Sequence, residues 1–265
     1  MTTTTDHTNL ERQGGAEPEP VPAQSNIKGI GRDLDRRQEL ACALRILAEA
    51  GWQENLSGHI TWVQEGSDDF WCNPWGIWWE ETSASDIVLV SADGDVVDGV
   101  WDVSGAVFIH TELHRARPDA RVAVHGHPYY ATLLGGLGLA PEIIHQNSCI
   151  FDGDIGFVDE YDGIIGDPDS GTKLATAIGH WTGVVLANHG AIVTGRTIAE
   201  ACYQAVTFER MCKFFYDSLL TGREARPIAS DVRAAMKPAL KQGCPQVYWN
   251  GAVRQLLRRQ PDVLG

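Results

Sequence analysis

Hydrophobic positions recur with two different periods along the chain, and the periods predict where helices and strands lie. Leucines recur at helical spacing with alanines between them over residues 32–50, which predicts a helix there. A second helix is predicted over 104–117, with Ser104 as its N-cap. A long amphipathic helix is predicted over 197–220, and Gly222 just beyond it is a typical residue at the end of a helix.

Short apolar segments separated by turn residues predict the strands. Residues 54–63 are typical of a turn that leads into a strand, and residues 86–97 of two strands joined at an Asp-Gly turn. A short strand is predicted over 121–124, and two strongly apolar strands over 182–195. Helices and strands alternate without a regular βαβ pattern, which favours an α/β sheet with antiparallel parts covered by helices.

The two ends of the chain differ from its middle. Residues 1–27 are rich in Thr, Pro, Glu and Gln and poor in large apolar groups, so we expect a disordered tail. Residues 28–225 contain the predicted sheet and its helices, and are expected to form one domain. Residues 226–265 are expected to form a C-terminal extension made of short helices.

Composition excludes several classes of partner. The 265 residues include 21 Lys and Arg against 35 Asp and Glu, a formal net charge of −14, which disfavours nucleic-acid binding. The sequence has no apolar run of the roughly 20 residues that a membrane span requires, and its first residues contain no apolar secretory signal. Six cysteines without a Cys-x-x-Cys pair are typical of a reducing, cytoplasmic compartment without disulfides.

Histidines supply the candidate chemistry. Among nine histidines, His125 and His127 flank Gly126 just beyond a predicted strand, which places two imidazoles on the same side of the backbone. Neutral imidazole is the commonest ligand for zinc and many other divalent ions. The same triplet also occurs in unrelated loops, as polar residues at a strand end. His189, between two apolar strands, is the candidate third ligand; its alternative role is a hydrogen-bonded turn histidine.

His110 and His114 form a second pair, four residues apart on one face of the predicted helix. A metalloprotease site would need Glu directly after the first histidine, and Thr111 stands there instead. We therefore expect one of these two histidines to line the same cleft as His125 and His127.

Three blocks of sequence together resemble the class II aldolase/adducin family. They are NLSGHIT at 55–61, SGAVFIHTELHRARPDARVAVHGHP at 104–128 and LANHGAIVTG at 186–195. The resemblance implies that His125, His127 and His189 bind a catalytic divalent cation: zinc, manganese or iron. It also implies an α/β fold of αβα layers with a largely antiparallel central sheet over 28–225, and a homotetramer whose active sites lie between subunits.

One departure from the family concerns the catalytic carboxylate. Aldolases of the family carry a Glu at the start of the helix before the His-x-His triplet, where this chain has Ala106. Alanine neither transfers a proton nor binds a metal. His110 follows one helical turn later, and we expect it to take over proton transfer.

A second departure concerns the phosphate pocket that the family's sugar-phosphate enzymes use. Its small polar positions correspond here to Gly58-His59, Trp75-Gly76 and Ser104-Gly105. An indole is a poor phosphate ligand but a good wall for an apolar or aromatic substrate. The predicted substrate-binding residues are therefore Trp75, Gly76, Ser104 and His59. The neighbouring Trp71, Trp78 and Trp79 are equally compatible with a core or a subunit interface.

These departures favour a metal-dependent carbon–carbon lyase that acts on a non-phosphorylated, aromatic carboxylate. Decarboxylation needs an electron sink and a later proton donor but no base for an alcohol, so the loss of the Glu favours a decarboxylase. His59 and His110 are the predicted catalytic residues. Two alternatives stay open: an Fe(II)-dependent decarboxylating oxygenase of an aryl-keto acid, and a non-catalytic, adducin-like interaction protein.

Overall fold

The central sheet organises the whole molecule. The computed structural model describes residues 26–160, 163 and 165–265, so the predicted disordered tail over 1–27 lies outside the described residues except for its last two positions. Within the described part, eight strands form one sheet in the order β4-β3-β2-β1-β5-β8-β7-β6. Neighbouring strands are antiparallel except for β6 and β7, which confirms the largely antiparallel sheet. The strands are β1 (His59–Val63), β2 (Phe70–Cys72), β3 (Val88–Val90), β4 (Val96–Asp98), β5 (Val122–Gly126), β6 (Ile155–Val158), β7 (Gly183–Leu186) and β8 (Gly190–Gly195).

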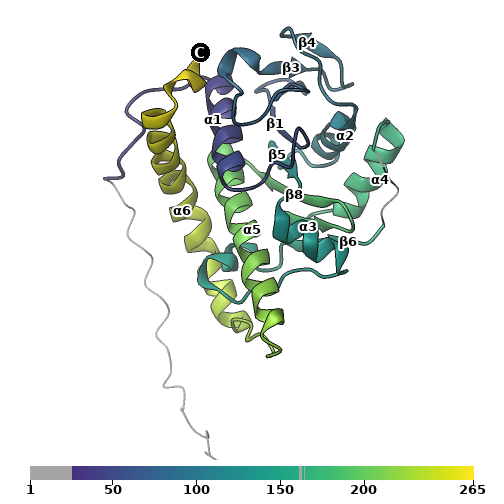
Figure 1. Ribbon diagram of the computed structural model, residues 1–265, viewed down its shortest axis with the longest axis vertical. Helices are drawn as coiled ribbons and strands as arrows, with labels where there is room; N and C mark the ends of the chain where they lie inside the picture. Colours follow the sequence, from purple (N-terminus) through teal and green to yellow (C-terminus); the bar gives the residue numbers. More distant parts are fainter. Residues whose placement is uncertain (1–25, 161–162, 164) are drawn as a thin grey trace, which may run out of the picture.

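Helices cover both faces of this sheet and give three αβα layers (Figure 1). Alternate residues of β5 face opposite layers, since Val124 belongs to the main core while Ala123 packs in a second cluster with Ile109. The helices of the first layer are α1 (Arg36–Glu49), α3 (Tyr129–Gly136), α5 (Ile198–Leu220) and α6 (Ser230–Arg259), and those of the second are α2 (Phe108–Ala116) and α4 (Pro168–Ile178). The short 3-10 turns are η1 (Ala84–Asp86), η2 (Gly105–Val107), η3 (Gln146–Phe151) and η4 (Pro261–Leu264).

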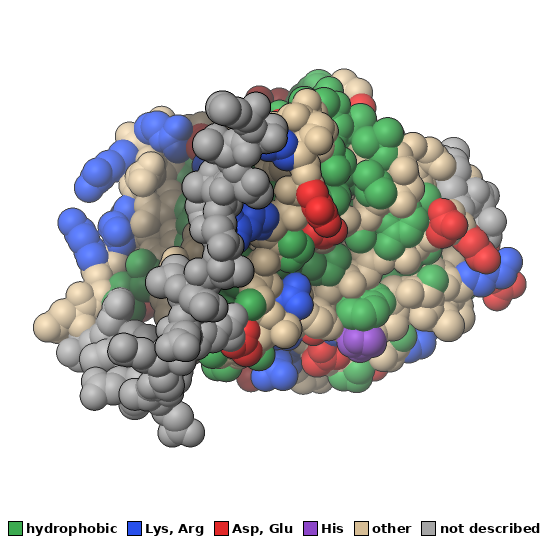
Figure 2. Space-filling model, turned by 90° about the horizontal axis from the view of Figure 1, so that it is seen from below, with side chains coloured by type: hydrophobic (Ala, Val, Ile, Leu, Met, Phe, Trp, Pro, Cys, Tyr) green, Lys and Arg blue, Asp and Glu red, His purple; other side chains and the backbone are tan. Residues whose placement is uncertain are grey.

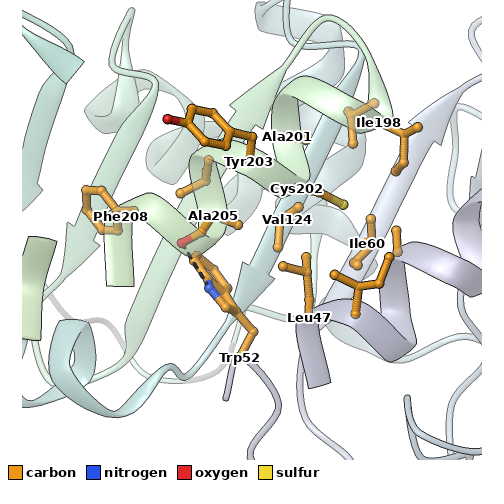
Figure 3. Close-up of a cluster of buried hydrophobic side chains, with 14 of the residues drawn as sticks. Leu47, Trp52, Ile60, Val124, Ile198, Ala201, Cys202, Tyr203, Ala205 and Phe208 are labelled. Atoms are coloured by element: carbon orange, nitrogen blue, oxygen red, sulfur yellow. Dashed lines mark hydrogen bonds between the residues drawn. The ribbon is translucent and has the colours of Figure 1, made fainter. Parts of the chain in front are cut away.

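The main core lies between the sheet and the helices α1 and α5 (Figure 3). Trp52 is fully buried there, and its indole N–H donates to the backbone carbonyl of Ala205 at 3.1 Å. Its own carbonyl accepts from the backbone N–H of His127 at 3.2 Å. The core is thus connected directly to the segment that carries the His-x-His triplet.

The predicted helices agree with the structure at their C-terminal ends, but α1 begins at Arg36, four residues after the predicted start at 32. Asp35 caps α1 by accepting from the backbone N–H of Gln38, and Thr197 caps α5 in the same way. Ser104 accepts from the backbone N–H of Ala106, as expected, but the first turn after it is the 3-10 turn η2 and the α-helix begins at Phe108. Short side chains and a glycine in that turn favour the tighter 3-10 geometry.

The prediction of several short helices after residue 225 is wrong. The region forms one helix of 30 residues, α6, which runs along α5 and contains Pro238 and Pro245. A proline removes one backbone hydrogen bond, so its presence in a helix is compensated by packing. Here Trp249 and Leu256 are buried in the main core.

Large hydrophobic side chains also occur on the surface. Hydrophobic groups are interspersed with acidic and basic ones on the face seen in Figure 2. In the tryptophan-rich segment, Trp79 is fully buried and Trp71 packs against the core, whereas Trp75 and Trp78 are 51% and 44% exposed. Among the described helices, none combines the length and apolar character needed to cross a membrane. The six cysteines are unpaired.

Candidate metal centre

The His-x-His triplet lies at the end of the central strand β5. His125 is the penultimate residue of the strand and His127 follows its last residue. The strand therefore extends further than the predicted 121–124, because Gly126 still pairs with Ala191 of β8. A Cβ atom at Gly126 would lie 2.5 Å from the carbonyl oxygen of Trp52, so only glycine fits between the two histidines.

His189 reaches the same place from the turn between β7 and β8. Asn188 adopts a left-handed conformation with φ of 54°, and the backbone N–H of His189 donates to the carbonyl of Leu186. A Cβ atom at the next residue, Gly190, would collide with the carbonyl of Gly126 and the ring of His127. The glycine allows the turn to approach the triplet closely.

These three imidazoles converge. One nitrogen from each of His125, His127 and His189 lies within 4.8 Å of the other two. The ring centroids are 4.8 to 5.4 Å apart, and the rings are inclined to one another rather than stacked flat. Three protein ligands are typical of a catalytic zinc site, and three histidines are one such set.

Contacts around the cluster orient two of the rings. The Nδ1 atom of His127 is 3.0 Å from a carboxylate oxygen of Glu54, and that of His125 is 3.1 Å from the carbonyl of Ala191. Both acceptors require a proton on Nδ1, which leaves Nε2 as the lone-pair donor. Nε2 of His127 is buried without a hydrogen-bond partner within the described residues. The donor set therefore fits a divalent cation.

The surroundings of two of these rings, His125 and His189, favour their neutral form. Burial lowers the pKa of His189 to about 4, with a further contribution from the neighbouring His127. Burial and the surrounding imidazoles hold the pKa of His125 well below its ordinary value. Neutral imidazole is the form that binds metals, so His125 and His189 need no deprotonation at neutral pH.

The two predicted catalytic histidines lie beside this cluster. His59 pairs with His125 across β1 and β5, and their ring centroids are 6.0 Å apart. His110, on α2, lies 5.5 Å from His59 and 6.4 Å from His125 between centroids. Burial lowers the pKa of His59 to about 4, and neither of its ring nitrogens has a hydrogen-bond partner within the described part of the chain.

Of the predicted substrate-binding residues, His59 lies beside the cluster, and Trp75 and Ser104 make hydrogen bonds with backbone groups. The backbone N–H of Trp75 donates to the carbonyl of Asp102, which brings Trp75 and Gly76 near the segment leading to Ser104. The side chain of the buried Asn73 donates to the carbonyl of Gly58, just before β1, and accepts from the backbone N–H of Ile60 within it. The indole of Trp75 is half-exposed, and the Ser104 hydroxyl caps η2.

Two residues that contact these histidines escaped the sequence analysis: Glu54, beside His127, and Thr61, beside His110 and His114. Glu54 directly precedes the block 55–61, and a carboxylate near a metal-binding histidine is a common orienting partner. Thr61 lies two residues after His59 and therefore on the same face of the strand. The alternation of residues along the strand could not identify these contacts. The contact of Glu54 joins two distant segments, and those of Thr61 depend on how α2 packs on β1.

Comparisons of the sequence and of the structure with known proteins relate this chain to the same family. Residues 38–216 match the family model for the class II aldolase and adducin N-terminal domain. A 4-hydroxy-3-prenylphenylpyruvate oxygenase/4-hydroxy-3-prenylbenzoate synthase from Streptomyces roseochromogenus subsp. oscitans is 30% identical over 230 residues, covering 84% of this chain and 82% of the relative. Decarboxylase NovR from Streptomyces niveus is 28% identical over 230 residues, with 84% of each chain covered. The structure of an L-fuculose 1-phosphate aldolase from Glaciozyma antarctica PI12 superposes with a TM-score of 0.75 at 26% identity, covering 86% of this chain and 91% of that one.

Proposed function

Since this chain belongs to the class II aldolase and adducin family, we propose that it is a divalent-metal-dependent carbon–carbon lyase. The proposed reaction is decarboxylation of a non-phosphorylated, aromatic carboxylate. The observation that carries the proposal is the convergence of three imidazoles, two of which are oriented by a carboxylate and a carbonyl.

His125, His127 and His189 would hold the cation, which we propose to be zinc, manganese or iron. When bound, such an ion supplies a Lewis acid that stabilises the negative charge formed beside a carbonyl or carboxylate oxygen when a carbon–carbon bond breaks. The three-histidine set leaves coordination positions for a substrate with two oxygen ligands.

Decarboxylation is favoured over aldol cleavage by a residue of the turn η2, just before α2. Ala106 offers no carboxylate for deprotonating an alcohol, and its backbone N–H bonds to Ser104. We assign substrate binding and proton transfer to His59 and His110, which lie next to His125. Trp75 and Gly76 would form part of the wall around the aromatic substrate.

The first test is metal analysis of protein purified anaerobically without added metal. We expect about one divalent ion per chain in the wild type and a loss of it in His127→Ala. His180→Ala is the matched control, because this exposed histidine contacts Trp181 and is no part of the cluster. Carbon dioxide release from hydroxyaryl carboxylates then tests the reaction. A wild-type protein that stays metal-free after reconstitution with zinc, manganese and iron would overturn the proposal.

A second candidate function is a decarboxylating Fe(II) oxygenase of an aryl-keto acid. The observation that favours it is the similarity to the Streptomyces oxygenase/synthase, which extends over 84% of this chain. Bound iron together with oxygen uptake in the presence of an aryl-keto acid would support this function. Carbon dioxide release without oxygen uptake would favour the lyase.

We further propose that the protein is a cytoplasmic homotetramer with a small-molecule carboxylate substrate and without a nucleic-acid or membrane partner. The exposed indoles of Trp75, Trp78 and Trp101 support self-association, because large aromatic side chains are enriched at protein interfaces. Light scattering on the purified protein tests the tetramer. A protein that lacks metal and activity but still assembles would instead match the adducin-like alternative.

A further inference from the structure

A buried chain of hydrogen bonds leads from the backbone to His110. The Nδ1 atom of His114 is 2.7 Å from the carbonyl oxygen of Ala120. The Nε2 atom of the same ring is 2.7 Å from the hydroxyl of Thr61, and that hydroxyl is 2.7 Å from Nδ1 of His110. The three side chains are buried, since Thr61, His110 and His114 are 0%, 0% and 9% exposed.

The direction of this chain follows from its first acceptor. A carbonyl oxygen only accepts, so His114 must carry a proton on Nδ1. Burial lowers the pKa of His114 to about 4, so the ring is neutral and its Nε2 is an acceptor. The single hydroxyl proton of Thr61 then points to His114, and the hydroxyl oxygen accepts from Nδ1 of His110.

The opposite edge of the His110 ring is therefore left with a lone pair. Its Nε2 atom is buried and has no hydrogen-bond partner among the described residues. The ring lies beside His59 and His125. A buried acceptor without a donor destabilises the folded protein, so a ligand that donates a hydrogen bond here would recover this cost.

We propose that Thr61 and His114 are positioning residues that hold His110 with Nδ1 protonated and Nε2 as a hydrogen-bond acceptor. This inference rests on the proposed function and specifies its substrate. The substrate group that meets His110 is a hydroxyl and not a carboxylate, because a lone pair repels an anion. The carboxylate then belongs at the three-histidine cluster, and the substrate class is a hydroxylated carboxylic acid. A proton delivered by His110 must first reach it from that hydroxyl or from solvent.

The chain of hydrogen bonds from Ala120 through His114 and Thr61 to His110, here called the relay, can be tested without substrate. Solid-state NMR of protein labelled with ¹⁵N-histidine distinguishes the two tautomers, and spectra of His110→Asn and His114→Asn assign the signals. In the wild-type protein, as isolated and after treatment with a chelator, we expect His110 to be protonated at Nδ1 only. Thr61→Val should mix the tautomers of His110, whereas Thr61→Ser, which keeps the hydroxyl, should restore the wild-type spectrum. A wild-type His110 protonated at Nε2 would overturn the relay, whatever the metal analysis shows.

The substrate requirement has its own test. Calorimetry on the zinc-loaded protein would compare each hydroxybenzoate isomer with its methoxybenzoate counterpart, which cannot donate a hydrogen bond. We expect one hydroxy isomer to bind about tenfold more tightly than its methoxy counterpart, which is the contribution of one buried hydrogen bond. Thr61→Val should lose this preference, and Thr61→Ser should keep it. Equal affinities for every pair would overturn the hydroxyl requirement. Metal content measured on the same sample separates this result from a failure of the proposed metal site.

Discussion

At the scale of single residues, oxygen atoms outside the metal cluster decide what its nitrogens can do. A carbonyl fixes the proton of His125, and the Glu54 carboxylate fixes that of His127. The same logic applied to Thr61 and His114 makes His110 an acceptor. In each of these histidines the atom that meets Nδ1 thus leaves the lone pair on Nε2.

Substitution of Glu54 tests this dependence. We expect Glu54→Gln to weaken divalent-metal affinity about 10–100-fold, because the amide is a weaker partner for His127 Nδ1 and orients the ring less firmly. Competition with a coloured chelator measures the affinity. Glu142→Gln changes an exposed glutamate outside the described contacts of the cluster and should bind metal as the wild type does. An unchanged affinity in Glu54→Gln would contradict the role given to this carboxylate.

At the scale of elements, the geometry of the metal cluster depends on two segments: the start of the helix α3, just after His127, and the turn between β7 and β8, which carries His189. The helix α3 starts directly after His127 and Pro128, and the Glu209 carboxylate of α5 accepts from the backbone N–H groups of Tyr130 and Ala131 at 2.8 and 3.0 Å. This side chain caps the first turn of α3 from a neighbouring helix. It therefore fixes the chain direction just beyond the triplet.

Glu209 makes this contact dependent on pH. Burial raises its pKa from 4.5 to about 7, although the two backbone donors and Lys213 oppose the shift. A pKa raised by folding means that the group's contribution to stability is complete below the unfolded pKa and is lost as pH rises through about 7. We expect the unfolding free energy of the wild type, relative to Glu209→Gln, to fall by on the order of 3 kcal/mol between pH 4.5 and 7. Urea titrations over this range measure it, and a difference that rises with pH would contradict the assignment.

Gly190 in the β7–β8 turn gives a second test at this scale. Gly190→Ala places a methyl group against the carbonyl of Gly126 and the ring of His127, so we expect a loss of about 2 kcal/mol or more in stability and weaker metal binding. Gly243→Ala, in the middle of α6 with open space around its Cβ position, should be stabilising by about 0.5–1 kcal/mol. Thermal unfolding with and without metal compares the two. Equal changes in stability in Gly190→Ala and Gly243→Ala would contradict the close approach of the β7–β8 turn to Gly126 and His127.

At the scale of the whole molecule, α6 joins the rest of the fold through its full length. Near its start, Arg233 pairs with Asp152, while Lys237 and Lys241 pair with Asp154 at 2.7 and 3.2 Å. Toward its end, Trp249 is buried in the main core. The chain end lies near α1, where the carbonyl of Leu264 accepts from Gln38 (Figure 1). These contacts favour one cooperative unit over a separable extension.

We therefore expect a single unfolding transition in which α6 takes part. Trp249→Ala should lower the stability by about 3–5 kcal/mol, the usual cost of removing a buried aromatic side chain. Val247→Ala, at a 39% exposed position of the same helix, should change the stability much less. Urea unfolding followed by fluorescence and circular dichroism measures both variants. A separate early transition in the wild type would show that residues 226–265 unfold independently.

Local patterns of the sequence determined most of the fold and the nitrogens of the site. The strand pairs around Gly94 and His189, and the helices starting near Asp35 and Thr197, follow from periodicity and capping residues. The three blocks that resemble the aldolase family identified the family itself. Each of these features depends on residues close together in the sequence, where the backbone period fixes which side chains share a face.

Only the tertiary structure decided which distant groups meet. The two prolines of α6 predict interruptions, and the helix stays continuous because long-range burial and ion pairs stabilise it. The contact between Glu54 and His127 joins residues 73 positions apart, and the relay from His110 through Thr61 depends on α2 packing on β1. Hydrogen-bond direction is set by these partners in space. The sequence by itself therefore determined that histidines gather at one end of the sheet, and the packing of the helices decided the proton that each one carries.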